Sequence, residues 1–145
     1  MKNFSPIDRD FARHVRASFE RQELMGLLGA KLAQISPGEV LIKLPFRQDL
    51  TQQDGYIHAG VIACILDNAC GYAAMTLQPP NVNILTAEFK VNFLSPAKGK
   101  TLIARGQVLK AGKTLAVCSG QAFPEEHSND QFIAFMLATM VSIPQ

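Results

Sequence analysis

The sequence predicts an α+β domain in which a five-stranded antiparallel sheet wraps around one long, buried helix. Residues 57–77 form an almost uninterrupted apolar stretch, and a helix that is apolar on nearly all sides belongs in a core or a membrane. Residues 85–93 alternate apolar and polar side chains, as a half-buried strand does. Short turns join the strands that follow, which favours antiparallel pairing. A sheet packed on one such helix is a two-layer α+β domain.

The chain opens with a helix predicted over about residues 6–28. Ser5 and Pro6 are typical of an N-cap followed by a first-turn proline, and apolar residues then recur every fourth position. This spacing places them on one face of the helix. We therefore expect an amphipathic helix that packs on a core spanning about residues 36–143. The recurring residues are Phe11, Val15 and Phe19.

A short strand and a polar loop lead into the central helix. Turn residues at 36–38 precede an alternating run at 40–44, and Pro45 ends that run. Residues 46–56 are polar and predict a loop. The central helix is then predicted over about residues 59–77.

Four further strands complete the predicted sheet, beginning with residues 85–93. Runs at 102–109 and 114–123 flank a turn and predict a hairpin. A polar loop at 124–130 precedes a very apolar last strand at 132–143. On the first of these strands strict alternation puts two sets of side chains on opposite faces, Leu85, Ala87, Phe89, Val91 and Phe93 against Thr86, Glu88, Lys90 and Asn92.

The central apolar stretch has the length of a transmembrane helix, but its sequence argues against one. About 20 apolar residues span a bilayer, yet Asp67 at the midpoint would cost roughly 2.5 to 3.5 kcal/mol on insertion scales. No second run of this kind exists, and no basic flank marks an orientation. We therefore expect a buried helix of a soluble protein with no membrane partner.

Composition predicts a single domain over residues 1–145 and excludes several partners. The net charge of +2 is small and scattered, which argues against a nucleic-acid partner. The three cysteines have no CxxC spacing and no metal-like spacing to histidine, so we expect reduced core residues and no metal site. The N-terminus lacks the features of a signal peptide, which favours a cytoplasmic location. The cysteines are Cys64, Cys70 and Cys118.

Asp67 is the first candidate for a functional residue, because a carboxylate is costly to bury in an apolar helix. A helical wheel places only small residues on the side of the helix that carries Asp67. Such neighbours leave room for a ligand or another backbone, where a purely structural helix would fill the space. The alternative is a buried carboxylate that caps a neighbouring backbone. The small residues of this face are Gly60, Ala63, Cys64, Cys70, Gly71 and Ala74.

A second candidate group lies at the start of the same helix. His58 precedes the helix, and the amides of Ala59 and Gly60 lie in its first turn, where they lack intrahelical partners and sit at the positive end of the helix dipole. Such donors can stabilise an oxyanion, worth roughly 2.7 to 4 kcal/mol in acyl-transfer sites. A histidine at this position can equally be only a hydrogen-bonded turn residue. With the carboxylate, the group suits hydrolysis of an ester or a thioester.

Three separate segments resemble one known family. QQDGYIHAGV at residues 52–61, with Asp67 nine residues after His58, resembles the helix-opening motif of the PaaI-like, phenylacetate-degradation type of hotdog thioesterases. FLSPAKG at 93–99 and KAGKT at 110–114 resemble the same family, and the resemblance covers about residues 25–143. It implies the hotdog fold, a sheet wrapped around a central helix, and hydrolysis of acyl-CoA thioesters.

The resemblance implies catalytic roles for the acid and for a residue of the next strand. Asp67 matches the family's general base or nucleophile, so both attack by activated water and a covalent anhydride remain open. Thr86, two residues before Glu88, matches a hydroxyl residue that assists the acid or the water.

The resemblance also implies roles for the segment before the helix. Gln52 would orient the water or the carbonyl, with Gln53 as the alternative, and His58 would orient the thioester or help the thiolate leave. The Ala59 amide would form the oxyanion hole. Glycine is common there in the family, but alanine keeps a backbone donor wherever its φ is negative.

Substrate binding and assembly follow from the same resemblance. The acid and the Gln/His/amide group come from opposite subunits, which implies a homodimer, commonly paired into a homotetramer. Independently of the resemblance, the helical wheel makes Gly60 and Gly71 candidates for substrate binding, because small residues let a ligand approach Asp67. Lys90, Lys110 and Lys113 are candidates for the CoA phosphates, although ordinary solvated lysines explain them equally. No cofactor is implied, because coenzyme A is part of the substrate.

The sequence thus predicts an acyl-CoA thioesterase, with a noncatalytic acyl-CoA-binding or sensing hotdog protein as the alternative. A hotdog dehydratase is disfavoured, because the His-Phe-Pro loop that such enzymes resemble is absent. The acyl group is not specified. Four residues either line its pocket or belong to the core, namely Phe89, Phe93, Phe132 and Met75.

Overall fold

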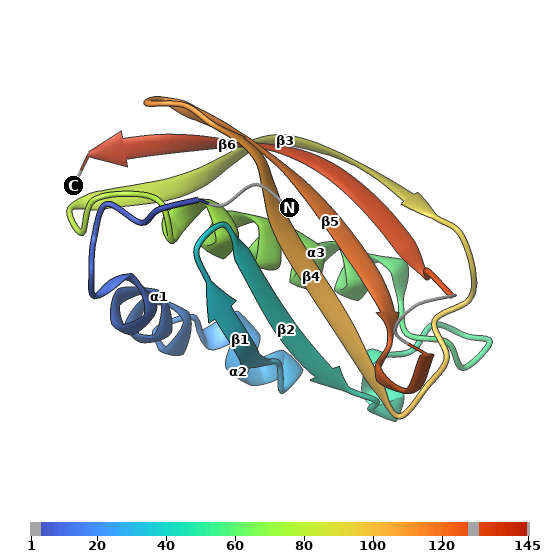
Figure 1. Ribbon diagram of the computed structural model, residues 1–145. Helices are drawn as coiled ribbons and strands as arrows, with labels where there is room; N and C mark the ends of the chain where they lie inside the picture. Colours follow the sequence, from blue (N-terminus) through green and yellow to red (C-terminus); the bar gives the residue numbers. More distant parts are fainter. Residues whose placement is uncertain (1–3, 128–130, 145) are drawn as a thin grey trace.

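The computed structural model, which describes residues 4–127 and 131–144, is a six-stranded sheet curved around one long helix (Figure 1). Every pair of neighbouring strands is antiparallel, in the order β1-β2-β4-β5-β6-β3. The predicted hotdog architecture is confirmed, with one strand more than expected. The strands are β1 (Lys31–Ser36), β2 (Glu39–Pro45), β3 (Val82–Phe93), β4 (Thr101–Ala111), β5 (Leu115–Pro124) and β6 (Ala134–Pro144).

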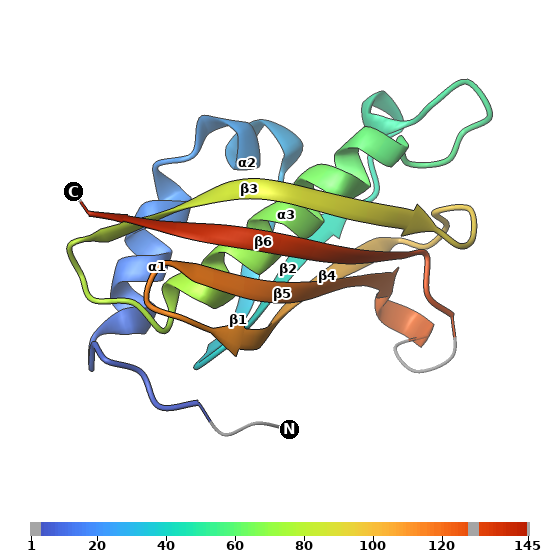
Figure 2. The same cartoon turned by 90° about the horizontal axis from the view of Figure 1, so that it is seen from above.

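The central helix α3 (Ala59–Met75) lies against the concave face of the sheet, and the two short helices α1 (Phe11–Glu20) and α2 (Glu23–Leu28) lie beside it (Figure 2). It ends two residues before the predicted Leu77. Thr76 is fully buried, and its Oγ1 donates to the Ala73 carbonyl at 2.6 Å and accepts from the Gly38 amide at 2.7 Å. These bonds close the helix against the β1–β2 turn. No helix in the described ranges is long and apolar enough to cross a membrane.

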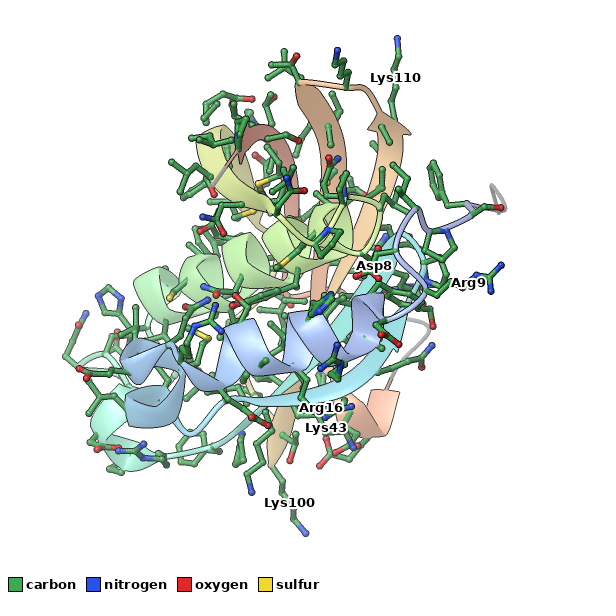
Figure 3. The ribbon with its side chains drawn as sticks, turned by 90° about the vertical axis from the view of Figure 1, so that its left-hand side faces the viewer. Asp8, Arg9, Arg16, Lys43, Lys100 and Lys110 are labelled. Atoms are coloured by element: carbon green, nitrogen blue, oxygen red, sulfur yellow. The ribbon has the colours of Figure 1, made fainter. Side chains whose placement is uncertain are left out.

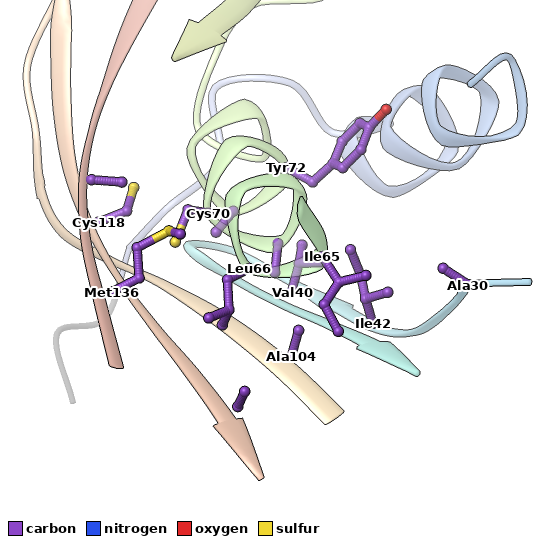
Figure 4. Packing of buried hydrophobic residues seen from close by; sticks show 14 of the residues in the cluster. Ala30, Val40, Ile42, Ile65, Leu66, Cys70, Tyr72, Ala104, Cys118 and Met136 are labelled. Atoms are coloured by element: carbon purple, nitrogen blue, oxygen red, sulfur yellow. The ribbon is translucent and has the colours of Figure 1, made fainter. Parts of the chain in front are cut away.

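A close contact between α3 and β4 seats the helix in the sheet. Gly106 of β4 faces the helix backbone, and a Cβ there would lie 2.2 Å from the carbonyl carbon and oxygen of Ala69. The approach at Gly120 of β5 is less close, with 3.1 Å between an added Cβ and the Cys70 sulfur. Figure 4 shows Leu66 and Cys70 on the side of α3 that meets this sheet. Backbone, not side chain, therefore forms part of the helix–sheet contact.

The N-terminal segment differs from the single helix predicted over residues 6–28. Helix α1 begins at Phe11, because the Asp8 side chain accepts from the Asp10 amide at 2.8 Å and contacts His14. The Asp10 amide, and then His14, hold the pKa of Asp8 below its usual range. The helix then breaks at Gln22, which is extended at φ −79° and ψ 106° and begins α2. Ser5 and Pro6 therefore do not cap a helix.

The sequence pattern does not indicate strand β1, because the pairing of this strand with β2 is irregular. Its pairing with β2 shifts between Leu32 and Gln34, so that Leu32 and Ile35, three residues apart, both pack against the core. This spacing is not the alternation that marks a strand in sequence.

A β-bulge in β3 overturns the strict alternation predicted for residues 85–93. Its pairing with β6 shifts between Thr86 and Glu88. Thr86 pairs with the fully buried Met140, which places it on the helix-facing side, whereas Leu85 pairs with Val141 and is 57% exposed on the outer side. The shift brings a hydroxyl to α3 and turns a leucine away from it.

The remaining predicted elements agree with the structure within a few residues. Val40, Ile42 and Leu44 of β2 are fully buried, and β4 and β5 form the predicted hairpin. The loop at 46–56 contains a single 3₁₀ turn, Gln48–Leu50. Another follows β5 at Glu125–His127, while residues 128–130 of the predicted polar loop lie outside the described residues.

Adding a single methyl group at Gly106 is expected to destabilise the fold. Gly106→Ala forces its Cβ against the α3 backbone, which cannot yield as a side-chain end does, and should lower the free energy of unfolding by about 3 kcal/mol in urea titrations. Gly26→Ala is the matched control, since nothing lies within 4 Å of its added Cβ and a helical alanine is favoured by about 1 kcal/mol. Equal stability of Gly106→Ala and the native protein would contradict the proposed contact.

Candidate active site

Asp67 and Thr86 form a hydrogen-bonded pair between α3 and β3. The Thr86 Oγ1 donates to the Asp67 Oδ1 at 2.7 Å, and both side chains are partly accessible. In the described part of the chain, Thr86 makes the only side-chain hydrogen bond to this carboxylate. The pair fixes one carboxylate oxygen, and no described side chain donates to the other.

The Asp67 carboxylate lies in the wall of a cavity of about 420 Å³ between α3, β3 and the α1–α2 turn. This size suits a small organic ligand. The residues around it are Ser18, Gln22, Asp67, Asn68, Gly71, Tyr72, Met75, Asn83, Ile84, Leu85 and Thr86.

The small residues predicted to flank Asp67 divide into two groups. Gly60, Ala63, Cys64 and Gly71 are partly or fully exposed, as expected for an open side of the helix. In contrast, Cys70 and Ala74 are buried, because α3 approaches the sheet closely there. Asp67 thus lies at the margin between the sheet-facing side and the open side of the helix.

The start of α3 carries one amide without an acceptor. His58 is the N-cap, and its ring Nδ1 accepts from the Gly60 amide at 2.9 Å. The Ala59 amide makes no hydrogen bond within residues 4–127 and 131–144 and is exposed. Within those ranges only glycines have positive φ, so Ala59 keeps the negative φ that an alanine donor requires. One free amide therefore faces solvent at the positive end of α3.

Gln52 lies beside this amide, and Gln53 does not. Gln52 lines a cavity of about 400 Å³ together with Ala59 and Phe93, whereas Gln53 is exposed outside it. The Gln52 side chain accepts from the Asp54 amide and donates to the Asp54 carboxylate at 3.3 Å. This loop geometry holds Gln52 close to the helix start.

The acid and the amide do not meet within one chain. Asp67 and Ala59 are eight residues apart on one helix, or about 12 Å along its axis, and they line different cavities. A single thioester carbonyl cannot contact both. Within one chain, the acid and the free amide therefore lie in two separate cavities.

In the single chain, the candidate CoA-binding lysines line neither the Asp67 cavity nor the Gln52 cavity. Lys110 and Lys113 belong to the β4–β5 hairpin end, and Figure 3 shows Lys110 at the opposite end of the molecule from Lys100. Lys90 donates to the Asn92 side chain on the outer face of β3. Near the helix start, Lys98 lies 5.3 Å from the centre of the Tyr56 ring.

Of the four acyl-pocket candidates, the three phenylalanines lie outside the buried core, whereas Met75 is partly buried and packs against it. Phe89, Phe93 and Phe132 are each about two-fifths exposed, at 43%, 45% and 39%. Met75 lines the Asp67 cavity and Phe93 lines the Gln52 cavity.

Sequence reasoning missed the polar residues at the far side of the Asp67 cavity. Tyr72 is buried, and its ring packs on Phe19 with 5.7 Å between centroids. Its hydroxyl, however, accepts from the Gln22 Nε2 at 2.6 Å and lies 3.3 Å from the Ser18 Oγ. The break in the N-terminal helix brings Gln22 to this position. No local sequence signal marks a pairing across 50 residues.

The cysteines near the acid are protonated thiols. Burial, and then the negative charge of Asp67, raises the pKa of Cys64. Burial raises the pKa of Cys70 far more, and it raises that of Cys118 to about 12. A raised pKa leaves less thiolate at neutral pH, which argues against a nucleophilic role for these cysteines.

A hotdog sheet around a helix that carries a hydroxyl-bonded carboxylate and a free N-terminal amide defines a class of acyl hydrolases. Comparison with known proteins identifies the family. The thioesterase superfamily model matches residues 54–129, and the chain belongs to this superfamily of thioester hydrolases.

Two solved structures and one sequence relative illustrate the relationship. A thioesterase family protein from Silicibacter pomeroyi is 42% identical, with a TM-score of 0.89 over 93% of this chain and 99% of that one. The Escherichia coli PaaI protein of the phenylacetic acid degradation operon shares the fold at 18% identity, with a TM-score of 0.83 over 92% and 94% of the two chains. Human acyl-coenzyme A thioesterase 13 is 31% identical over 91 residues, 61% of this chain and 63% of that protein.

Removal of the Cys64 thiol is expected to leave hydrolysis nearly unchanged. The raised pKa keeps this thiol protonated at pH 7 to 8, so Cys64→Ala should hydrolyse a model thioester within about twofold of the native rate. Thiol release followed by absorbance measures this. A loss of a hundredfold or more, in a variant that still folds, would instead identify Cys64 as the nucleophile.

Proposed function

We propose that the protein hydrolyses acyl-CoA thioesters, with Asp67 activating the attacking water. The observation that carries this proposal is the Asp67–Thr86 hydrogen bond in the wall of a ligand-sized cavity, on the helix whose N-terminal Ala59 amide has no acceptor in the described chain. A carboxylate base and an oxyanion donor are the two groups that hydrolysis of a thioester requires.

The proposed reaction proceeds through one tetrahedral intermediate. Asp67 takes a proton from water as the water oxygen bonds to the thioester carbon, and the carbonyl oxygen becomes an oxyanion that accepts from an Ala59 amide. The carbon–sulfur bond then breaks. The thiolate of coenzyme A leaves with the proton that Asp67 returns, and the free acid departs. Thr86 keeps the carboxylate oriented throughout, and Gln52 positions the water or the carbonyl. The reaction uses no metal or cofactor.

A second copy of the chain supplies the amide half of each site. The separation of about 12 Å between Asp67 and Ala59 along α3 prevents one chain from using both on one carbonyl. Strand β3 is a long edge strand with Leu85, Phe89 and Phe93 exposed, and such an edge pairs readily with another strand. Two antiparallel α3 helices in a homodimer bring each Asp67 toward the other chain's Ala59.

The proposal also covers the assembly of dimers into a tetramer and the location of the protein in the cell. The outer face of the sheet exposes Leu115, Phe135 and Leu137, which suits the pairing of two dimers into a homotetramer. Lys90, Lys110 and Lys113 remain candidates for the phosphates of coenzyme A in such an assembly. The three cysteines are free thiols, which fits a reducing compartment, and we place the reaction in the cytoplasm.

Loss of the Asp67 charge is expected to abolish hydrolysis without unfolding the protein. Asp67→Asn keeps the shape and the Thr86 bond but cannot take a proton from water, so kcat should fall by about a thousandfold or more in a thiol-release assay. Asp10→Asn is the control, because Asp10 precedes α1, its side chain makes no capping hydrogen bond, and it is exposed in a surface ion pair with Arg13. Near-normal turnover by Asp67→Asn would refute the role of this carboxylate. Saturable acyl-CoA binding without turnover by the native protein would favour the noncatalytic alternative.

Two inactive variants are expected to restore activity when mixed. Ala59→Pro removes the amide donor, and proline is tolerated at a first helical position after a residue such as His58, whose φ is −59° and ψ 137°. It should cost about a hundredfold or more in kcat. Refolding Ala59→Pro with Asp67→Asn in equal amounts gives mixed dimers with one intact site, and about a quarter of native activity should return. No recovery would show that both groups act within one chain.

A further inference from the structure

Helix α2 has apolar side chains on both of its sides. Its sequence is ELMGLL, in which Glu23 is the only polar side chain. Met25 and Leu28 are buried in the core, at 0% and 7% exposure. Leu24 and Leu27, three residues apart, lie on the other side and are 49% and 70% exposed. A helix that is apolar all round is normally buried on every side. The surface formed by Leu24 and Leu27, called the α2 face below, therefore lacks the cover that such a helix has.

Packing within the chain does not account for the α2 face. A helix of six residues is too short to form by itself, and Gly26 in its middle weakens it further. What holds α2 in place is the buried pair Met25 and Leu28, together with Gly29, which ends the helix in the left-handed conformation at φ 72°. The α2 face is not needed for this anchoring, and polar side chains there would keep the helix soluble at no cost to the core.

Helix α2 extends from the acid cavity to the loop that carries Gln52. Gln22, the N-cap of α2, lines the Asp67 cavity. At the other end of α2, the Leu27 carbonyl accepts from the Arg47 Nη1 at 2.7 Å, and Arg47 lies in the loop that leads to α3. Figure 2 shows α2 and this loop along the margin of the molecule that also carries the edge strand β3. The α2 face therefore belongs to the side of the molecule that is proposed to pair with a second copy.

A second copy that brings its Ala59 amide to Asp67 has to cross this margin. The α1–α2 turn bounds the cavity that Asp67 lines, so the incoming segment passes beside α2. That segment is the loop before the α3 helix of the second copy, and it has an exposed apolar residue of its own, Phe46, at 39%. A stable interface has a desolvated apolar centre in addition to the main-chain bonds of an edge strand. Leucines and a phenylalanine on the two surfaces would supply that centre.

We infer that the α2 face is a docking surface for a second copy of this chain, which closes over Leu24 and Leu27 when the shared active site forms. The inference rests on the proposed function, because the division of the site between two chains is the reason for a second copy on this side. Each α2 then separates the Asp67 cavity of its own chain from the loop of the other chain. Leu24 and Leu27 are docking residues and do not contact the reacting atoms.

A charge on the α2 face is expected to separate the two copies. Leu27→Glu places an unpaired carboxylate in the interface, so the dissociation constant of the pair should rise by about a hundredfold or more. At low micromolar concentration, sedimentation velocity should give half the native mass, and thiol release from an acyl-CoA should fall in parallel. Circular dichroism should show an intact fold, since the Leu27 side chain is 70% exposed within one chain.

Ile7→Glu is the matched control. It places the same charge on a residue that is 69% exposed, precedes α1 and lines neither the Asp67 cavity nor the Gln52 cavity, so native mass and activity should remain. Leu24→Gln is a second variant of the α2 face, with the same expected losses of mass and activity if Leu27→Glu does not fold.

Mass and activity together distinguish the ways in which the inference can fail. Native mass for a folded Leu27→Glu, or a halved mass with full activity per subunit, would overturn the docking surface and leave the proposed thioesterase intact. A native protein that hydrolyses no acyl-CoA would overturn the proposed function. The docking surface would then still be supported if Leu27→Glu, and not Ile7→Glu, halves the mass.

Discussion

The contact between the α3 backbone and the β4 backbone at Gly106 determines how the whole domain is arranged. A side chain at Gly106 would overlap the Ala69 carbonyl, so the absence of a Cβ lets the sheet close on the helix. With one side of α3 seated in this way, Leu66, Ala69, Cys70 and Ala73 are buried. The opposite margin remains open, and it carries the acid.

Glycine and other small residues on α3 and its neighbours therefore serve two different purposes. Gly106 and Gly120 allow close packing, and the small side chains of Ala69 and Cys70 lie opposite them. Gly71 has no such neighbour and borders a cavity. A helix packed this closely on one side has little freedom to shift against the sheet, which fixes the position of Asp67 relative to Thr86 on β3. The proposed site, shared between two chains, depends on that rigidity.

Much of the fold and part of the site could be predicted from sequence, because local patterns carry them. The apolar run around Asp67 predicted the central helix, and the alternation in β2 and the β4–β5 hairpin predicted buried strands. The start of the helix predicted available amides at Ala59 and Gly60. The Ala59 amide has no acceptor in the described residues, but the Gly60 amide donates to the His58 ring. The break at Gln22 and the irregular strand β1 were missed. At Gln22 and in strand β1, contacts with other elements override the pattern of neighbouring residues in the sequence.

By itself, the sequence determined that a carboxylate sits inside an apolar helix whose N-terminus carries an available amide, because periodicity and helix ends are properties of neighbouring residues. Only the tertiary structure decided which groups surround that carboxylate. The bulge between Thr86 and Glu88 turns Thr86 toward Asp67 against strict alternation, and it exists only through pairing with β6. The Gln22–Tyr72 contact joins residues 50 positions apart. Such contacts depend on how distant segments pack, and no periodicity within either segment encodes them.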